Sequence, residues 1–362
     1  MDLNKLSLEE KIGQKFIFGV YLDNVEIIVR LIKEHFIGGV ILYKKNYSNY
    51  NDMLSVIKRL KDANKDNKIP LFIAIDQEGG RVNRMPQEFN NLKNIYEMSM
   101  KDDKLIDMNA SITGRMLNGM GINMNFAPVL DIYDGKSKVL YNRCFYGNYD
   151  NVYNCGLRYV NKLNNNKVIS VVKHFPGHGA TTVDSHFFTP YIFDYKKVLD
   201  KHIIPFDKIL DNTNEYGYAD CVMVNHIVIR KLTDRLPASI SKKFINEYIR
   251  KRNHFNGLVI TDEMNMLSRN IVYKFNYLKK MFECDADIYL FKIKKENEAV
   301  RIIDKYNKFI KNNDSYKKIL DNSIKRIVDI KNKYDVNDDI SYDGCIVDEI
   351  NKEIDEVNKL WL

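Results

Sequence analysis

Short apolar runs bounded by Gly, Pro, Asn or Asp recur along the chain, and longer amphipathic segments separate them. This alternation is typical of strands that alternate with helices. The eight runs that we expect to form strands are residues 16–20, 39–43, 71–75, 123–128, 168–173, 221–225, 258–261 and 287–291. Eight strand–helix repeats favour a closed parallel (β/α)8 barrel of the TIM type over an open doubly wound sheet.

The segments between these runs have a helical period. Ile28, Leu31 and Ile32 follow the i, i+3, i+4 spacing, and the last helices are expected around 300–310 and 319–330. After Tyr334 the chain becomes acidic and polar and then offers an amphipathic stretch to its end. The pattern therefore predicts one α/β catalytic domain over residues 1–334 and a C-terminal helical tail over 335–362, whose role the sequence leaves open.

Composition narrows the class of protein. The chain has 362 residues, of which 45% are hydrophobic and 29% charged, so disordered and fibrous classes are excluded. The net charge is +8, but the lysines are scattered among asparagines and form no basic block. This pattern gives no indication of nucleic-acid binding. Five cysteines without a CxxC pair indicate neither a disulfide framework nor a zinc ribbon. These thiols fit a reducing compartment.

The N-terminus is charged and amphipathic where a secretory signal would carry an apolar run. No stretch approaches the ~18 uninterrupted apolar residues of a membrane span. We therefore expect a soluble, cytoplasmic protein without a membrane span, acting as a monomer.

Polar and titratable side chains follow several of the predicted strands. Asp76 comes after the third, Lys173 ends the fifth, His226 follows the sixth and Asp262 the seventh. The carboxyl ends of barrel strands meet at one rim, where active sites of this fold lie. An Asp at such a position is also a common helix cap. Taken alone, Asp262 therefore favours a structural role over a catalytic one.

The segment KHFPGHGATTVDSH, residues 173–186, is more informative, because it places three histidines among glycines and a proline. In an extended segment Asp184 and His186 project to the same side, and a carboxylate can orient an imidazole and raise its basicity. This pair is suited to acid/base chemistry. The competing interpretation is a zinc site built from His174, His178, Asp184 and His186, which we disfavour because an HExxH motif is absent.

This loop and eight further segments resemble the β-N-acetylglucosaminidases of glycoside hydrolase family 3, the bacterial hexosaminidases of peptidoglycan recycling. The resemblance covers almost the whole chain, through LSLEEKIGQKF, GGVILYKKN, AIDQEGGRVNRM, NMNFAPVLDI, VMVNH, LPASIS, GLVITDEMNM and LDNSIKRIVDIKNKY. The β-glucosidases of the family take their acid/base carboxylate from a second domain, whereas the N-acetylglucosaminidases take an Asp–His pair from the KHFPGHG loop. This chain has the loop and no visible second domain.

The resemblance also implies roles for matching residues. Asp262 falls at the position of the nucleophile, and His186 at that of the general acid/base with Asp184 as its partner. Five further residues match sugar-binding positions: Asp76, Arg84, Arg143, Lys173 and His174.

The expected function is that of a retaining exo-β-N-acetylglucosaminidase, which hydrolyses terminal β-linked GlcNAc, in particular from GlcNAc–anhydroMurNAc muropeptides. A histidine with a pKa near 6.5 suits proton transfer at neutral pH. The only partner implied is the amino-sugar substrate, and no cofactor is implied. The alternatives are a phosphorylase of the same glycosides, a non-catalytic sugar-binding barrel and a metal-dependent hydrolase.

Overall fold

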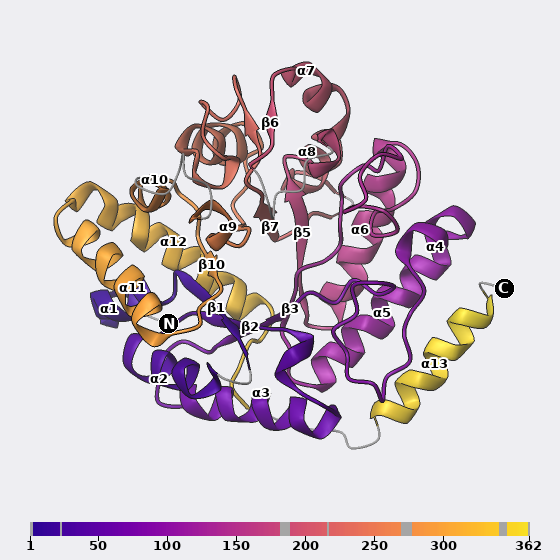
Figure 1. The fold of residues 1–362 in the computed structure, drawn as a ribbon, viewed down its shortest axis with the longest axis horizontal. Helices are drawn as coiled ribbons and strands as arrows, with labels where there is room; N and C mark the ends of the chain where they lie inside the picture. The colour runs from indigo at the N-terminus through magenta and orange to yellow at the C-terminus, as the bar shows by residue number, and fades with distance from the viewer. Residues whose placement is uncertain are drawn as a thin grey trace.

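The computed structural model describes residues 3–21, 24–181, 189–215, 217–268, 277–339 and 346–360. Its centre is a parallel sheet of eight strands in the order β10-β1-β2-β3-β4-β5-β7-β9 (Figure 1). The bridge between Ile260 and Ile288 brings β9 next to β10 and closes the sheet into a barrel. The predicted (β/α)8 fold is therefore confirmed.

The barrel strands are β1 (Phe16–Val20), β2 (Gly39–Leu42), β3 (Phe72–Ile75), β4 (Met124–Asn125), β5 (Ile169–Phe175), β7 (Cys221–Val224), β9 (Leu258–Thr261) and β10 (Tyr289–Phe291). Their residues are almost all buried, as expected for strands that face a packed interior on one side and helices on the other. The short strands β6 (Tyr191–Ile192) and β8 (Val228–Ile229) form a separate parallel pair. Seven of the eight predicted runs contain a barrel strand, and the eighth, 168–173, covers most of β5.

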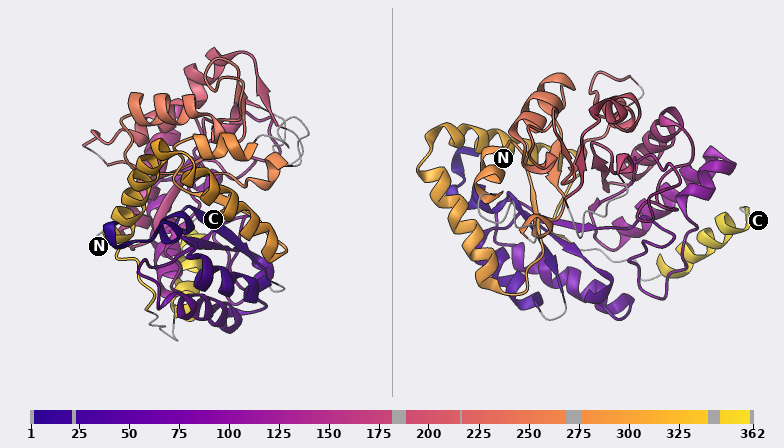
Figure 2. Two further views of the ribbon diagram at one scale, coloured as in Figure 1. Left: turned by 90° about the vertical axis from the view of Figure 1, so that its left-hand side faces the viewer. Right: turned by 45° about the horizontal axis from the view of Figure 1, so that its top comes forward.

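Helices surround the barrel on its outside (Figure 2). They are α1 (Leu8–Gly13), α2 (Val25–His35), α3 (Tyr50–Asn64), α4 (Ile95–Lys101), α5 (Asp103–Gly119), α6 (Tyr149–Asn165), α7 (Tyr195–Lys197), α8 (Ile204–Leu210), α9 (Asn265–Ser268), α10 (Tyr277–Glu283), α11 (Glu296–Lys311), α12 (Asp314–Lys333) and α13 (Ile346–Leu360), together with π-helical turns at Val198–His202 and Lys243–Arg252. Each long helix buries one apolar stripe, such as Ile28, Leu31 and Ile32 of α2.

The C-terminal helix α13 lies outside the ring of barrel helices, beside α5 (Figure 1). It buries Ile346, Ile350, Ile354 and Val357, and Arg115 of α5 forms ion pairs with Glu349 and Glu353 on α13. The helical tail is thus present, while the predicted domain boundary at residue 334 stays a prediction. No helix in the described part of the chain has the length and apolar character of a membrane span.

Candidate active site

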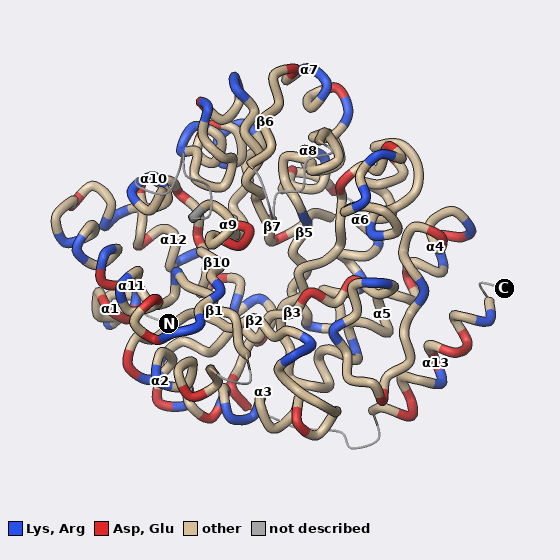
Figure 3. Tube along the Cα trace, viewed as in Figure 1, with Lys and Arg blue, Asp and Glu red and all other residues tan. Residues whose placement is uncertain are grey.

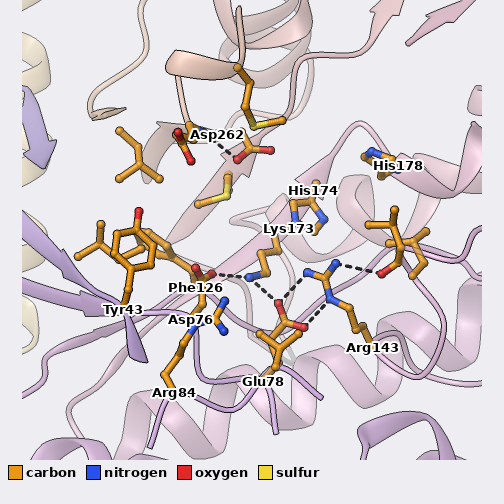
Figure 4. A pocket seen from close by; sticks show the side chains of 18 of the residues that line it. Tyr43, Asp76, Glu78, Arg84, Phe126, Arg143, Lys173, His174, His178 and Asp262 are labelled. Carbon is orange, nitrogen blue, oxygen red and sulfur yellow. Dashed lines mark hydrogen bonds and ion pairs between the residues drawn. The ribbon is translucent and has the colours of Figure 1, made fainter. Parts of the chain in front are cut away.

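A cavity of about 260 Å3 opens at the carboxyl ends of the barrel strands. Its walls carry side chains that follow β2, β3, β4, β5, β9 and β10 (Figure 4). This end of a parallel barrel is where loops, free of the packing demands of the core, present functional groups. Six residues predicted from the sequence line it together: Asp76, Arg84, Arg143, Lys173, His174 and Asp262.

One side of the cavity is a network of buried charges. The Lys173 ammonium lies 2.7 Å from a carboxylate oxygen of Asp76 and 2.7 Å from one of Glu78. Arg143 donates two hydrogen bonds of 2.8 Å to the two oxygens of Glu78. Bidentate pairing of this kind fixes the guanidinium plane as well as its charge. The donors and acceptors at this wall are therefore held in place before any ligand arrives.

The buried charges of the network support one another. Burial raises the pKa of the Glu78 carboxyl, but Arg143 and Lys173 outweigh that effect and hold the pKa well below its usual range. Burial lowers the pKa of Lys173, yet Asp76 and Glu78 leave it raised overall. Both groups are consequently charged at neutral pH.

Asp131 organises the start of the KHFPGHG loop. This carboxylate is fully buried; one oxygen lies 2.7 Å from Nδ1 of His174 and accepts the His174 amide at 3.2 Å, and the other accepts the His178 amide at 2.5 Å. Burial raises the pKa of Asp131, but the neighbouring His174 outweighs this and lowers it. Asp131 therefore fixes both the ring orientation of His174 and the path of the loop.

The loop also needs its glycine at position 179. A Cβ atom there would stand 2.0 Å from the carbonyl oxygen of Ile132, so the loop packs against the chain following β4 without space for a side chain. This close approach keeps His174 and His178 beside the cavity, which both of them line.

Asp262 directly follows β9 and lies across the cavity from Lys173 and Asp76 (Figure 4). Its amide donates to the Val224 carbonyl at 2.9 Å, and one of its carboxylate oxygens accepts the Glu263 amide at 2.7 Å. His226 lies behind this turn, with Nε2 3.0 Å from the Glu263 carbonyl oxygen. The strand end is thereby held so that the Asp262 carboxylate faces the cavity.

The remaining walls come from β10 and from the segment after β3. Lys292 lies 2.5 Å from a Glu263 carboxylate oxygen, and its ammonium is 5.0 Å from the ring centre of Tyr43. The main chain of Arg84 is fixed by Gln77, which accepts its amide at 2.8 Å, and by Tyr47, which donates to its carbonyl oxygen at 2.5 Å. These contacts place the Arg84 side chain at the cavity wall.

Two predicted catalytic residues, Asp184 and His186, lie outside the described residues. The zinc alternative depends on the same two positions. Within the described ranges, no group of three or more His, Cys, Asp or Glu side chains is arranged to hold a metal ion.

Sequence reasoning missed Glu78 and Asp131. Both stand inside segments already singled out, AIDQEGGRVNRM and NMNFAPVLDI, but neither was assigned a role. Their partners are 65 and 43 residues away along the chain, so only the folded barrel brings them together. An acidic residue three positions after the end of a predicted strand was the available signal.

Known proteins give a consistent family assignment. Residues 7–330 match the glycosyl hydrolase family 3 N terminal domain. The chain is 30% identical over 262 residues to a β-hexosaminidase of Psychromonas ingrahamii, covering 70% of this chain and 74% of that protein. It is 32% identical over 256 residues to β-hexosaminidase A of Pseudoalteromonas piscicida, which covers 65% of this chain but only 42% of that longer protein.

A solved structure agrees with these relatives. The family 3 β-N-acetylglucosaminidase from Paenibacillus sp. FPU-7 superposes with a TM-score of 0.87 at 26% identity, covering 98% of this chain and 68% of that one. The resemblance inferred from the motifs is thus confirmed. The chain belongs to glycosyl hydrolase family 3.

Proposed function

We propose that the protein is a retaining exo-β-N-acetylglucosaminidase that removes terminal, non-reducing β-linked GlcNAc. The observation that carries this proposal is the cavity itself, which combines Asp262 with a rigid set of polar groups on the opposite wall. At about 260 Å3 it is slightly smaller than the ~300–1,000 Å3 typical of ligand pockets. Such a space suits one sugar ring better than a stretch of polysaccharide. The named activities of the relatives support the same substrate class.

In this proposal Asp262 is the nucleophile. Its carboxylate oxygen attacks the anomeric carbon, the bond from that carbon to the leaving oxygen breaks, and His186 gives a proton to the leaving oxygen. In the second step His186 takes a proton from water, whose oxygen attacks the same carbon and releases Asp262. Two displacements at one carbon retain its configuration.

The other proposed residues bind the sugar. Lys173, Arg143 and Arg84 donate to hydroxyl groups, and Asp76 accepts from them, while His174 presents Nε2 because Asp131 engages Nδ1. Because these groups are already paired, little side-chain freedom remains to be lost when substrate binds. Asp184 is proposed to orient His186.

We further propose that the natural substrates are peptidoglycan fragments of the GlcNAc–anhydroMurNAc type, cleaved by a monomer in the cytoplasm. Among the described cysteines, four are buried free thiols, which suits a reducing compartment. The muropeptide assignment rests on the resemblance to the peptidoglycan-recycling enzymes.

The first test compares p-nitrophenyl β-N-acetylglucosaminide with the β-glucoside. We expect far faster release from the N-acetylglucosaminide, unchanged by EDTA. Each assay is run with and without inorganic phosphate, and the sugar product is identified as GlcNAc or GlcNAc-1-phosphate. A preference for the glucoside would overturn the substrate, and phosphate-dependent formation of the sugar phosphate would make the enzyme a phosphorylase. Binding of GlcNAc without turnover would support a non-catalytic barrel.

The second test addresses Asp262. Asp262→Ala should lower kcat by at least ~10^3-fold, while the neighbouring Glu263→Gln keeps the ability to form the glycosyl-enzyme. A 2-acetamido-5-fluoro glycosyl fluoride should label Asp262 in the wild type. A peptide adduct found on Glu263 or Asp76 by mass spectrometry would contradict this role.

A further inference from the structure

The C-terminal helix α13 reaches beyond α5 to the segment of residues 88–93, which belongs to the connection between β3 and α4. Asn351 accepts the Asn90 amide at 2.7 Å and donates to the Glu88 carbonyl oxygen at 2.7 Å. Two helical turns further along α13, Asn358 accepts the Lys93 amide at 3.3 Å and donates to the Asn91 carbonyl oxygen at 3.1 Å. Each asparagine side chain thus accepts a hydrogen bond from a main-chain amide and donates one to a main-chain carbonyl oxygen, as the backbone of a neighbouring strand would.

The spacing on α13 separates two faces. Ile346, Ile350, Ile354 and Val357 form the stripe buried toward the barrel helices. Asn351 and Asn358 are seven residues apart, two helical turns, and therefore lie on one common face. Asp355, four residues after Asn351, joins that face and accepts the Asn90 side-chain amide at 2.9 Å. Asparagine is a poor helix former in an interior turn, so its use here is explained by the contacts it makes.

Residues 88–93, which α13 contacts, are themselves hydrogen-bonded to the turn around Gly80, close to the cavity-lining Glu78. The Gly80 amide donates to the Leu92 carbonyl oxygen at 2.9 Å, and the Asn91 side chain donates to the Gly80 carbonyl oxygen at 2.7 Å. Gly80 has a φ of +54°, and a Cβ atom there would lie 2.8 Å from Cβ of Asn94. The chain around Gly80 is therefore in direct contact with residues 91–94 of the same connection. Glu78 is two residues before Gly80.

We infer that α13 is a brace for the connection between β3 and α4, and that Asn351 and Asn358 are positioning residues for sugar binding. They act through residues 88–93 and Gly80 on Glu78, which fixes Arg143 and Lys173 at the cavity. This assigns a role to the tail, and its effect on catalysis rests on the proposed function. Because the brace acts on binding groups and not on Asp262, it affects KM more than kcat.

The test uses the full-length Asn351→Ala/Asn358→Ala double variant. Alanine favours the helix, so α13 itself is not weakened while its bonds to the loop are lost. The matched control is Lys352→Ala/Lys359→Ala on the exposed face of the same helix. We expect the double variant to raise KM for p-nitrophenyl β-N-acetylglucosaminide about three- to ten-fold with kcat within about two-fold of wild type, and the control to match wild type.

Hydrogen–deuterium exchange reports on the brace independently of activity. Amides of residues 78–93 should exchange at least about ten-fold faster in the double variant than in the wild type, with no change in the control. If the double variant fails to fold, Asp355→Ala, which removes one bond only, should show the same shift in smaller measure. Unchanged exchange and KM, or a fall in kcat at constant KM, would overturn the inference. Faster exchange in a protein without hexosaminidase activity would leave the brace standing and overturn the proposed function.

Discussion

At the scale of single residues, Asp131 shows how a carboxylate outside the cavity can determine what the cavity presents. Among the residues that the structure describes, its side-chain hydrogen-bond partners are His174 and His178, at the start of the KHFPGHG loop. A carboxylate has only acceptor oxygens, and every group facing Asp131 in these contacts is a donor. An amide at this position would turn one acceptor into a donor and oppose one of the bonds.

Asp131→Asn should therefore lower kcat/KM by about 10- to 100-fold, since a hydrogen bond to a charged group contributes ~1.5–3 kcal/mol. Steady-state kinetics on the N-acetylglucosaminide measures the effect. Asp134→Asn, at a half-buried position of the same connection outside the cavity lining, is the control and should match the wild type. A wild-type rate for Asp131→Asn would mean that the orientation of His174 does not matter.

Glu78→Gln tests the buried network. Removing one partner of a buried ion pair typically costs ~3–5 kcal/mol, so the melting temperature at pH 7 should fall clearly. The pKa of Glu78 is lowered in the folded state, so its contribution is present above the unfolded value near 4.5 and is lost as pH falls toward the folded pKa. The difference in stability between wild type and variant should accordingly shrink below about pH 4.5. Glu9→Gln, which removes an exposed pair with Lys311, should change little at any pH.

At the scale of elements, the sequence predicts strands well where apolar character and burial coincide. The runs 16–20 and 258–261 coincide with β1 and β9. The run 123–128 was longer than β4, although the Asn123 main chain bonds Ile73 and Ile169 and its side chain accepts the Ile73 amide at 2.9 Å. Pro128, at the other end of the run, has no amide hydrogen to donate. The run 168–173 was too short, because β5 continues to Phe175.

The same comparison explains what the sequence reveals about the site. Residues at or just after strand ends, such as Asp76, Lys173 and Asp262, line one cavity, since the fold itself brings strand ends together. Glu78 and Asp131 were missed because their importance lies in partners supplied by other connections. The contacts of α13 were equally out of reach, because an asparagine in a helix does not show in the sequence which main-chain groups it will meet.

The connection after β5 carries a prediction of its own, concerning the proton. If His186 is the acid/base, His186→Ala should lose most activity on poor leaving groups and much less on activated aryl leaving groups, which depart without protonation. Asp184→Ala should show a milder form of the same dependence. Rates of glycosylation across a series of aryl glycosides of graded leaving-group pKa measure it. Equal losses across that series would limit His186 to substrate positioning.

At the scale of the whole molecule, side chains reinforce the main-chain hydrogen bonds that close the barrel. Beside the single bridge between β9 and β10, the buried carboxylate of Asp287 accepts the Val259 amide at 2.8 Å and the Ser323 hydroxyl at 2.8 Å. Arg326 of α12 donates to the same carboxylate at 2.8 Å. Helix α12 thus fixes the seam of the barrel beside β9, the strand that Asp262 directly follows.

Charged residues of both signs are mixed along the chain, with Lys and Arg interspersed among Asp and Glu (Figure 3). The cavity shows the same balance in a smaller space. Within the described ranges, its charged lining consists of four basic and four acidic side chains, namely Arg84, Arg143, Lys173, Lys292, Asp76, Glu78, Asp262 and Glu263.

This balance decides which ligands gain from electrostatics. Because these groups carry no net charge together, a neutral sugar binds through hydrogen bonds at short range, and salt has little to screen. KM for the neutral N-acetylglucosaminide should therefore change less than about two-fold between ~0.05 and ~0.5 M NaCl. A 6-phosphorylated sugar should be a weaker competitive inhibitor than GlcNAc. Its phosphate would lose hydration on binding, and the cavity has no excess of basic side chains to compensate the phosphate charge. Inhibitors for this cavity should accordingly be neutral in the ring portion, and selectivity should come from hydroxyl geometry.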